Sequence, residues 1–265
     1  MNRKLDLELS PELEIYRDKI EATIKPYIEI KLTNNDKPTW WQSKFGGLPY
    51  LPKGFEYPKS FDGEYLYLLA QINFAEVPHL EGFPKKGILQ FYIAADGEFY
   101  GADFDNDPTQ QNKFRVLYFS NIDLNKDNLI TDFSFLPQLK DKFLLPFQGC
   151  CRVTYSLKYA PISPSDYKFN FFPLYEESYE EIGEEYYDKF SLGHKIGGYP
   201  DFTQSDPRPE SPQDEEYILL FQIDSEQNNA IDLCWGDVGI ANFFIKKSNL
   251  EKLNFSDVWY NWDCG

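Results

Sequence analysis

Few residues in this chain of 265 have the type and spacing that catalysis or metal binding requires. The two histidines, His79 and His194, lie in no Gly-x-Ser-x-Gly or similar motif, so neither indicates a Ser/His/Asp or Cys/His site, and we expect both on exposed loops. Cys150 and Cys151 are adjacent, and on a strand they would point to opposite faces, which is poor geometry for sharing one metal ion. The sequence therefore predicts no catalytic residue, no metal site and no cofactor.

Acidic side chains dominate the remaining chemistry, with 43 Asp and Glu against 26 Lys and Arg and a formal net charge of −17. A charge of this size repels phosphate backbones and anionic lipid, and it attracts cationic partners. We therefore expect a basic protein as the partner and argue against nucleic acid and membrane surfaces. The oligomeric state does not follow from the sequence.

The binding residues that we expect come from two parts of the chain. The dense acidic run at residues 176–188 is typical of a helix with a solvated face, which could also meet a cationic partner. An aromatic pair precedes a Gly-Gly turn, and aromatic side chains are enriched at interfaces. The candidate binding residues are Trp40, Trp41, Tyr50, Glu177, Glu181 and Glu184.

Two classes of function are compatible with this composition. The sequence favours a non-enzymatic, protein-binding module, acidic and chaperone- or inhibitor-like, because no catalytic signature accompanies the charge. The alternative is an enzyme that uses a carboxylate pair in a cleft between two repeats of the chain, since general acid–base catalysis needs only two well-placed carboxyl groups.

An internal repeat sets the elements that must position these residues. Residues 44–72 align without a gap to residues 195–223, 151 positions later, and 11 of the 29 aligned positions are identical. Ordinary amino-acid usage would give about two. We expect the shared residues to serve the fold, with each glutamine amide bonded to the backbone of its neighbouring Gly-Gly turn. These shared motif residues are Gly46, Gly47, Pro49 and Gln71 in the first copy and Gly197, Gly198, Pro200 and Gln222 in the second.

Hydrophobic patterns predict the individual elements. Ser10-Pro11 followed by apolar residues at helical spacing predicts a helix at about 11–25, and the acidic run predicts another at 178–190. Residues 205–214 have the composition of an exposed loop, and Ser248-x-x-Glu251 has the form of a capping box that begins a short helix. Strands are predicted at 67–72, 88–93, 115–119, 152–159, 218–223, 240–245 and 258–264.

These elements predict an internally duplicated α+β fold, with two pseudo-symmetric units of mainly antiparallel sheet and a few peripheral helices. We expect residues 1–265 to form a single compact body. Repeat 1 would span about 40–160 and repeat 2 about 191–265, joined by an acidic helical segment at about 175–190. The charged N-terminus, the absence of a long apolar run and the few cysteines predict a cytoplasmic protein with reduced thiols.

Three short motifs carry a family resemblance, namely Lys44-Phe45-Gly46-Gly47-Leu48-Pro49, Leu68-Leu69-Ala70-Gln71-Ile72 and Trp235-Gly236-Asp237. They resemble the bacterial YwqG family over nearly the whole chain, and because that family has no assigned function the resemblance implies no catalytic residue. More distantly, Gly-Gly-x-Pro followed by Leu-Leu-x-Gln-Ile is similar to eukaryotic proteins of the programmed-cell-death-two type. Those proteins are associated with chaperoning a basic ribosomal protein, so this likeness implies a chaperone-like role, without the zinc-type cysteine pairs that this chain lacks.

Overall fold

The computed structural model describes residues 4–5, 8–33, 37–105, 107–172, 179–191, 193–209 and 215–265. Its helices are α1 (Pro11–Glu14), α2 (Arg17–Ala22), α3 (Glu180–Phe190) and α4 (Lys247–Glu251), with short 3-10 turns η1 (Lys126–Asn128) and η2 (Lys142–Leu144). Its strands are β1 (Lys25–Leu32), β2 (Lys44–Gly46), β3 (Tyr67–Asn73), β4 (Ile88–Ile93), β5 (Phe114–Phe119), β6 (Phe147–Ala160), β7 (Lys195–Gly197), β8 (Tyr217–Asp224), β9 (Glu226–Gln227), β10 (Ile231–Leu233), β11 (Ile240–Lys246) and β12 (Val258–Asp263).

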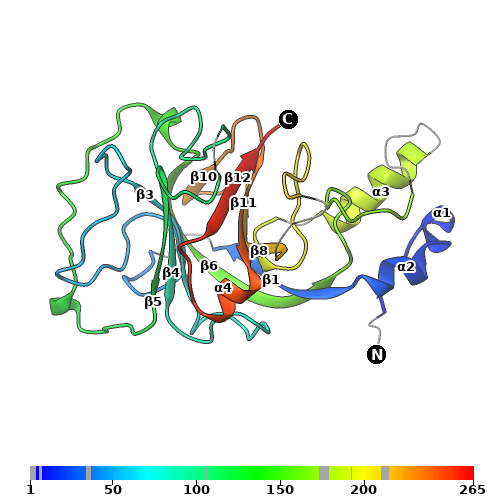
Figure 1. Cartoon of the computed structure of the whole chain (residues 1–265), viewed down its shortest axis with the longest axis horizontal. Helices are drawn as coiled ribbons and strands as arrows, with labels where there is room; N and C mark the ends of the chain where they lie inside the picture. The colour runs from blue at the N-terminus through cyan, green and yellow to red at the C-terminus, as the bar shows by residue number, and fades with distance from the viewer. Residues whose placement is uncertain are drawn as a thin grey trace.

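The strands form one twelve-stranded sheet, and every pairing within the described ranges is antiparallel. The order along its main path is β12-β11-β8-β7-β1-β6-β2-β3-β4-β5, while β10 and β9 branch from the beginning of β6. The sheet curls into a nearly closed, barrel-like form, and α1, α2 and α3 gather at one end of the molecule (Figure 1). The predicted combination of mainly antiparallel sheet with few helices is therefore present.

The sheet has two matching halves, one on each side of the central pair β1 and β6. The long strands β1 and β6 pair over eight residues, and each continues to a short strand, β7 on one side and β2 on the other. Beyond these, β8-β11-β12 occupy the places on one side that β3-β4-β5 occupy on the other. Strands at matching positions therefore carry the two aligned sequence segments.

The central strand β1 was not among the predicted elements. The predicted helix at 11–25 is instead two short helices that end at Ala22, and the chain is already extended at Lys25. Pro26 fits in β1, and Ile28 and Ile30 alternate with polar residues and are buried. This period of two is a strand signal, directly after the helical spacing stops.

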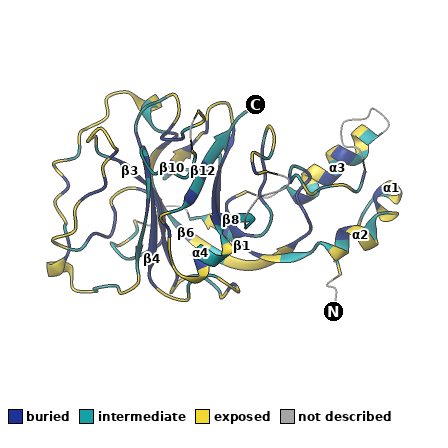
Figure 2. Ribbon diagram, viewed as in Figure 1, coloured by how far each residue is buried: buried dark blue, intermediate teal, exposed yellow. Residues whose placement is uncertain are grey.

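Aromatic side chains from the two halves pack against each other in the interior. The ring of Phe91 on β4 lies 4.8 Å from Phe221 on β8 and 4.7 Å from Phe243 on β11, measured between centroids. Phe114 on β5 is 5.3 Å from Tyr260 on β12. Strands β4, β8 and β11 are accordingly among the most deeply buried parts of the chain (Figure 2). The burial of several aromatic rings at these centroid distances stabilises one continuous core.

The loop between β4 and β5 covers the gap between the outermost strands. The Gln111 side chain accepts a hydrogen bond from the Val116 N–H at 2.7 Å and donates one to the Phe255 carbonyl at 2.6 Å. The Tyr260 N–H donates to the Pro108 carbonyl at 3.3 Å. Covering strand edges in this way satisfies backbone groups that would otherwise be free to pair with another chain.

The Gly-Gly turns have the same backbone conformation in both halves. Gly46 and Gly197 have φ of 66° and 68°, and Gly47 and Gly198 have φ of 76° and 75°. A Cβ on Gly46 would lie 2.4 Å from the Gly149 carbonyl oxygen, so only glycine fits there. Pro49 and Pro200, which follow the two turns, are both buried.

The amide of Gln71 is fully buried and makes four hydrogen bonds. Its Oε1 accepts from the Tyr50 N–H at 2.7 Å and from Gln90 Nε2 at 2.8 Å. Its Nε2 donates to the carbonyls of Trp40 and Gln42, each at 2.8 Å. The amide therefore ties its strand to the segments before and after the Gly-Gly turn, and not to the two glycines of the turn as expected.

Gln222 makes the corresponding bonds in the second half. Its Oε1 accepts from the Asp201 N–H at 2.8 Å, and its Nε2 donates to the Gly193 carbonyl at 2.9 Å. Asp201 and Gly193 stand 151 positions after Tyr50 and Gln42, which bond Gln71. The same side-chain type therefore ties the same two backbone positions in both halves.

The helix α4 begins without the predicted capping box. Its N-cap is Lys246, with no capping hydrogen bond from its side chain, and the Ser248 N–H donates to Glu215 Oε1 at 2.8 Å. The incoming carboxylate from the segment before β8 satisfies a backbone donor that the local motif was expected to satisfy. Within the described ranges, no helix combines the length and the apolar character that crossing a membrane requires.

Candidate functional site

The acidic helix α3 is held against the rest of the molecule by its aromatic face. Tyr186 and Phe190 are buried in a cluster with Leu13 of α1 and Ile20 of α2. The Tyr186 hydroxyl also donates to the Ile162 carbonyl at 2.9 Å, just after β6 ends. This packing leaves the opposite, charged face of α3 free, as expected for an amphipathic helix.

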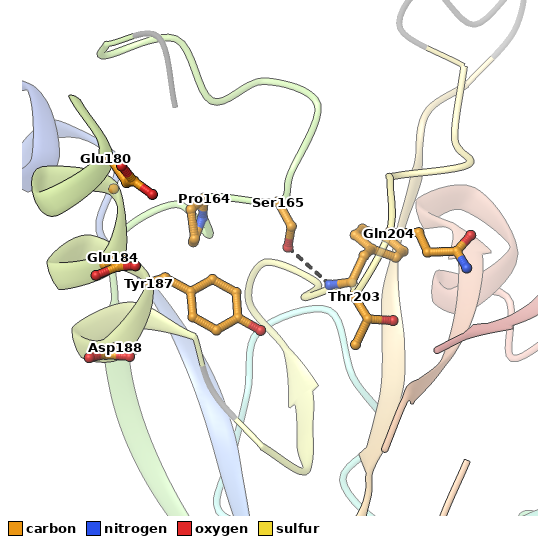
Figure 3. A pocket seen from close by; sticks show the side chains of 10 residues that line it. Pro164, Ser165, Glu180, Glu184, Tyr187, Asp188, Thr203 and Gln204 are labelled. Atoms are coloured by element: carbon orange, nitrogen blue, oxygen red, sulfur yellow. Dashed lines mark hydrogen bonds between the residues drawn. The ribbon is translucent and has the colours of Figure 1, made fainter. Parts of the chain in front are cut away.

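A groove of about 470 Å³ lies beside α3. One wall is the helix, and the other is formed by the segments that follow β6 and β7 (Figure 3). Gly183 has no side chain to fill the space next to the helix. The lining residues are Pro164, Ser165, Glu180, Gly183, Glu184, Tyr187, Asp188, Phe202, Thr203 and Gln204.

Three carboxylates follow one line along the helical wall. Glu180, Glu184 and Asp188 are spaced by four residues, so they lie on the same side of α3 (Figure 3). All three are exposed, and none forms an ion pair with another described residue. We call these three residues the acidic stripe. By contrast Glu185, one position round the helix, lies 3.7 Å from Lys189 Nζ.

The structure separates the acidic candidates predicted from the sequence. Glu184 lines the groove, whereas Glu181 is exposed on α3 outside the lining. Glu177 lies outside the described residues. Glu180 and Asp188, which belong to the same acidic run, are the groove residues that the candidate set omits, and their four-residue spacing from Glu184 was the available signal.

The aromatic candidates are in the first half and form a different part of the structure. Trp40 and Trp41 are partly buried: Trp40 stacks on Phe133 with a centroid distance of 6.0 Å, and Trp41 Nε1 donates to the Asp123 carbonyl at 2.7 Å. Tyr50 is fully buried, and its hydroxyl accepts from the Asp123 N–H at 2.8 Å. Its expected role at a binding surface is therefore corrected: burial leaves Tyr50 no surface to offer a partner.

Behind the groove lies a buried polar network that the sequence did not indicate. Ser165 Oγ, on the groove wall, accepts from the Phe202 N–H at 2.9 Å and lies 3.0 Å from Ser163 Oγ. Ser163 donates to Asp201 Oδ1 at 2.5 Å, and the Lys195 ammonium donates to the other oxygen of Asp201. Burial lowers the pKa of Lys195, an effect that Asp201 opposes.

A second buried charge cluster supports the same wall. Arg208 donates to Asp166 Oδ2 at 2.9 Å and to Asp206 Oδ2 at 2.6 Å, and all three side chains are almost fully buried. The prediction of an exposed loop at 205–214 is wrong at Arg208, because two carboxylates neutralise its charge and allow burial. Residues 210–214 lie outside the described residues.

His194 is a structural residue, contrary to its predicted place on an exposed loop. Its side chain is 1% exposed, its Nδ1 accepts from the Asp224 N–H at 2.9 Å, and its Nε2 lies 3.0 Å from Glu226 Oε2. The hydrogen bond from His194 lowers the pKa of Glu226. Because Nδ1 already accepts a backbone proton, Nε2 carries the imidazole hydrogen and is not free to ligate a metal. His79, in contrast, is exposed as predicted.

The carboxylates of the groove all stand on one wall, on α3, and the described residues form no metal site there. Within the described ranges no group of three His, Cys, Asp or Glu side chains could hold a metal ion. Burial raises the pKa of both Asp224 and Asp263, yet neither lines the groove. Asp263 instead accepts from the backbone of Thr203 and Gln204, which fixes that wall from behind.

Comparison with known proteins adds the family but no activity. No curated protein matches this chain. A family model described as a domain of unknown function, DUF1963, matches residues 43–264, a range that includes both Gly-Gly turns, all strands after β1 and the whole groove. Because this range is most of the chain, the protein belongs to the DUF1963 family.

Proposed function

We propose that this protein is a non-enzymatic binding module that holds a basic segment of another protein in the groove beside α3. The observation that carries the proposal is the acidic stripe: three exposed carboxylates in one line, without a cation from the described residues, on the wall of a 470 Å³ groove. Tyr187, 41% exposed on the same wall, offers a ring face to a lysine or arginine side chain.

The energetics of the free helix support this proposal. Like charges four residues apart on a helix cost about 0.2–0.5 kcal/mol per pair, and the stripe contains two such pairs. A bound ammonium or guanidinium group would attract both carboxylates of a pair and so offset their repulsion. The net charge of −17 would add long-range attraction and raise the rate at which a basic partner arrives.

The resemblance of the sequence motifs is the basis for a finer proposal of the same kind. We propose that the two halves arose by internal duplication, that the chain is close to the YwqG proteins, and that the likeness to programmed-cell-death-two-type proteins extends to a chaperone- or inhibitor-like task. The matched glutamine bonds agree with a duplicated framework. The basic partner would then bind in the groove between α3 and the segments that follow β6 and β7.

The test is binding of a fluorescein-labelled octa-arginine peptide, followed by anisotropy at several salt concentrations. Replacing Glu180, Glu184 and Asp188 by their amides should weaken binding by about 3- to 140-fold, since each exposed ion pair contributes roughly 0.2–1 kcal/mol. The control changes Glu56, Glu81 and Asp237, which are exposed elsewhere, to amides and so alters the net charge equally. Equal weakening in both triple variants would show that only the overall charge matters and would refute the groove as the site.

A further inference from the structure

A second pocket, of about 340 Å³, is built largely on the long loop between β4 and β5 and shares no lining residue with the groove beside α3. Three of the residues that line it are phenylalanines with large exposed fractions: 72% for Phe61, 50% for Phe104 and 38% for Phe99. A single exposed apolar side chain is common on protein surfaces. Three such rings around one cavity form an apolar patch of the kind that binds a ligand.

Backbone contacts hold these rings in position before a ligand arrives. The Phe61 N–H donates to the Asn112 carbonyl at 2.8 Å, and Trp262 Nε1 on β12 donates to the Phe99 carbonyl at 2.7 Å. The rings of Phe99 and Phe104 lie 6.1 Å apart between centroids at an interplanar angle of 58°, so they form two tilted walls and do not stack on each other. Walls that are positioned in advance lose little conformational freedom on binding.

The loop that carries Phe99 and Phe104 is longer than its counterpart in the second half. Residues 94–113 join β4 to β5, whereas residues 247–257 join β11 to β12 at the matching positions of the sheet. The framework that the two halves share therefore does not require these rings. Like the Lys195–Asp201 pair, they are a feature that one half has added.

The charged residues of the pocket favour a cationic ligand. Asp103 and Asp105 line the pocket beside the rings, and the Asp105 N–H donates to Asp103 Oδ1 at 3.3 Å. Lys113 also lines the pocket, but its Nζ lies 3.4 Å from Asp96 Oδ2, on a residue outside this lining. Two carboxylates and one ammonium give the lining a formal charge of −1. An anion would be repelled, and a neutral apolar ligand would remove water from the carboxylates without replacing it.

The aromatic walls decide which kind of cation fits. Ammonium and guanidinium groups with N–H donors need hydrogen-bond acceptors around them, and the phenylalanine side chain has none. A quaternary ammonium group has no N–H and carries its charge on methyl groups, so it loses no hydrogen bond when aromatic rings replace its water. The ring faces attract it through their quadrupole, as in the aromatic cages that recognise choline and methylated lysine.

From these observations we propose that the pocket between Phe61, Phe99 and Phe104 binds a quaternary ammonium group. Its volume is near the lower end of the range of about 300–1,000 Å³ for small-molecule sites, which suits one ammonium group on a short chain. This binding does not depend on the groove beside α3, where carboxylates on a helix would accept hydrogen bonds from lysine or arginine.

The experiment titrates the full chain with choline and with 3,3-dimethylbutanol, the neutral analogue in which carbon replaces nitrogen, and follows binding by saturation-transfer NMR. We expect choline to bind about 10-fold more tightly, because the two compounds have the same shape and differ in charge. Equal affinities, or no binding of choline, would overturn the proposal.

Substitutions locate the site and test the role of the rings. Phe61→Leu and Phe104→Leu keep an apolar side chain without the ring, so each should weaken choline binding by about 3-fold and leave binding of the neutral alcohol unchanged. Phe61→Trp should tighten choline binding, since indole attracts cations more strongly than phenyl. The control is Phe143→Leu, at a residue that is 67% exposed outside this pocket, and it should change neither affinity. Equal choline affinities in Phe61→Leu and Phe143→Leu would refute the pocket as the site.

A last pair of ligands distinguishes a free compound from a modified protein. A short peptide with one trimethyllysine and the same peptide unmethylated are titrated into the amide variant of the acidic stripe, so that the groove contributes little. Binding of the trimethylated peptide more tightly than choline would assign the pocket to a methylated protein segment, and the opposite order would assign it to a free compound. Choline binding without octa-arginine binding would support this pocket and refute the groove, and octa-arginine binding without choline binding would do the reverse.

Discussion

Replacing Gln71 by Leu tests whether one buried amide holds the first half together. Leucine has nearly the same volume, but it cannot replace the four hydrogen bonds of the amide. The Tyr50 N–H and the carbonyls of Trp40 and Gln42 would then lose these partners. Removing the amide therefore changes hydrogen bonding far more than it changes packing.

The magnitude follows from the number of groups left unsatisfied. Each unmet buried donor or acceptor costs about 1–3 kcal/mol, and local relaxation recovers part of the sum, so we expect a loss of roughly 3–5 kcal/mol. A chain of this size loses about 2–4 °C of melting temperature per kcal/mol, which gives a decrease of about 6–20 °C. Such a loss is a large part of the total stability of about 5–15 kcal/mol that folded domains have.

The assay is urea and thermal unfolding of Gln71→Leu, Gln222→Leu and the matched control Gln227→Leu. Gln222 bonds the corresponding backbone positions, so its substitution should act in the same direction. Gln227 is exposed on β9, and its substitution should change the free energy of unfolding by less than about 0.5 kcal/mol. If Gln71→Leu melted within about 2 °C of the unsubstituted chain, the reasoning from buried amide bonds would be refuted.

Two further predictions concern pH. His194→Ser introduces the residue found at the matching position 43 and removes the pairing with Glu226. Because His194 lowers the pKa of Glu226, the stabilisation that this pair gives the folded chain is complete above about pH 5 and is lost as the pH falls below about 4. The difference in urea midpoint between the unsubstituted chain and His194→Ser should therefore shrink over that range. A constant difference would contradict the pairing. Burial lowers the pKa of Lys44 to about 8, so up to about pH 10 the folded chain binds fewer protons at this residue than the unfolded chain, and the free energy of unfolding rises with pH. Lys44→Met should flatten that rise between pH 8 and about 10, whereas Lys53→Met, at an exposed site, should not. Equal pH slopes of the free energy of unfolding in Lys44→Met and the unsubstituted chain, measured by urea titration, would exclude this contribution.

The sequence was sufficient to predict the elements whose signal is local. Apolar runs and period-two alternation identify β3, β4, β5, β8, β11 and β12 within one residue at each end, and they identify β6 except for its first five residues. The paired glycines indicate turns with positive φ, and the repeated Gln71 and Gln222 indicate buried amides because a polar side chain inside an apolar run needs hydrogen bonds. These features depend on neighbours in the chain or on the comparison of the two repeats.

The groove could not be predicted in the same way, because its residues meet only through the fold. Ser163 and Asp201 are 38 positions apart, and neither stands in a motif that would join them. Charged residues such as Arg208 and Lys195 are assigned to the surface by default, and only the approach of distant carboxylates makes their burial possible. One signal was available: Lys195 and Asp201 align with Lys44 and Tyr50 next to a turn that both repeats retain.

The differences between matched positions point to the half of the molecule in which function should lie. In the first half, the Lys44 ammonium donates to the carbonyls of Thr39 and Leu48, and the segment closes on itself. In the second half, the equivalent Lys195 donates to Asp201, and the bonds continue through Ser163 to the groove. Bonds common to both halves, such as those of the two glutamines, are explained by the shared framework, whereas the Lys195–Asp201 ion pair has no counterpart in the first half, where the buried Lys44 donates to backbone carbonyls. The retention of that pair directly behind the groove is therefore the strongest structural reason to look for function there.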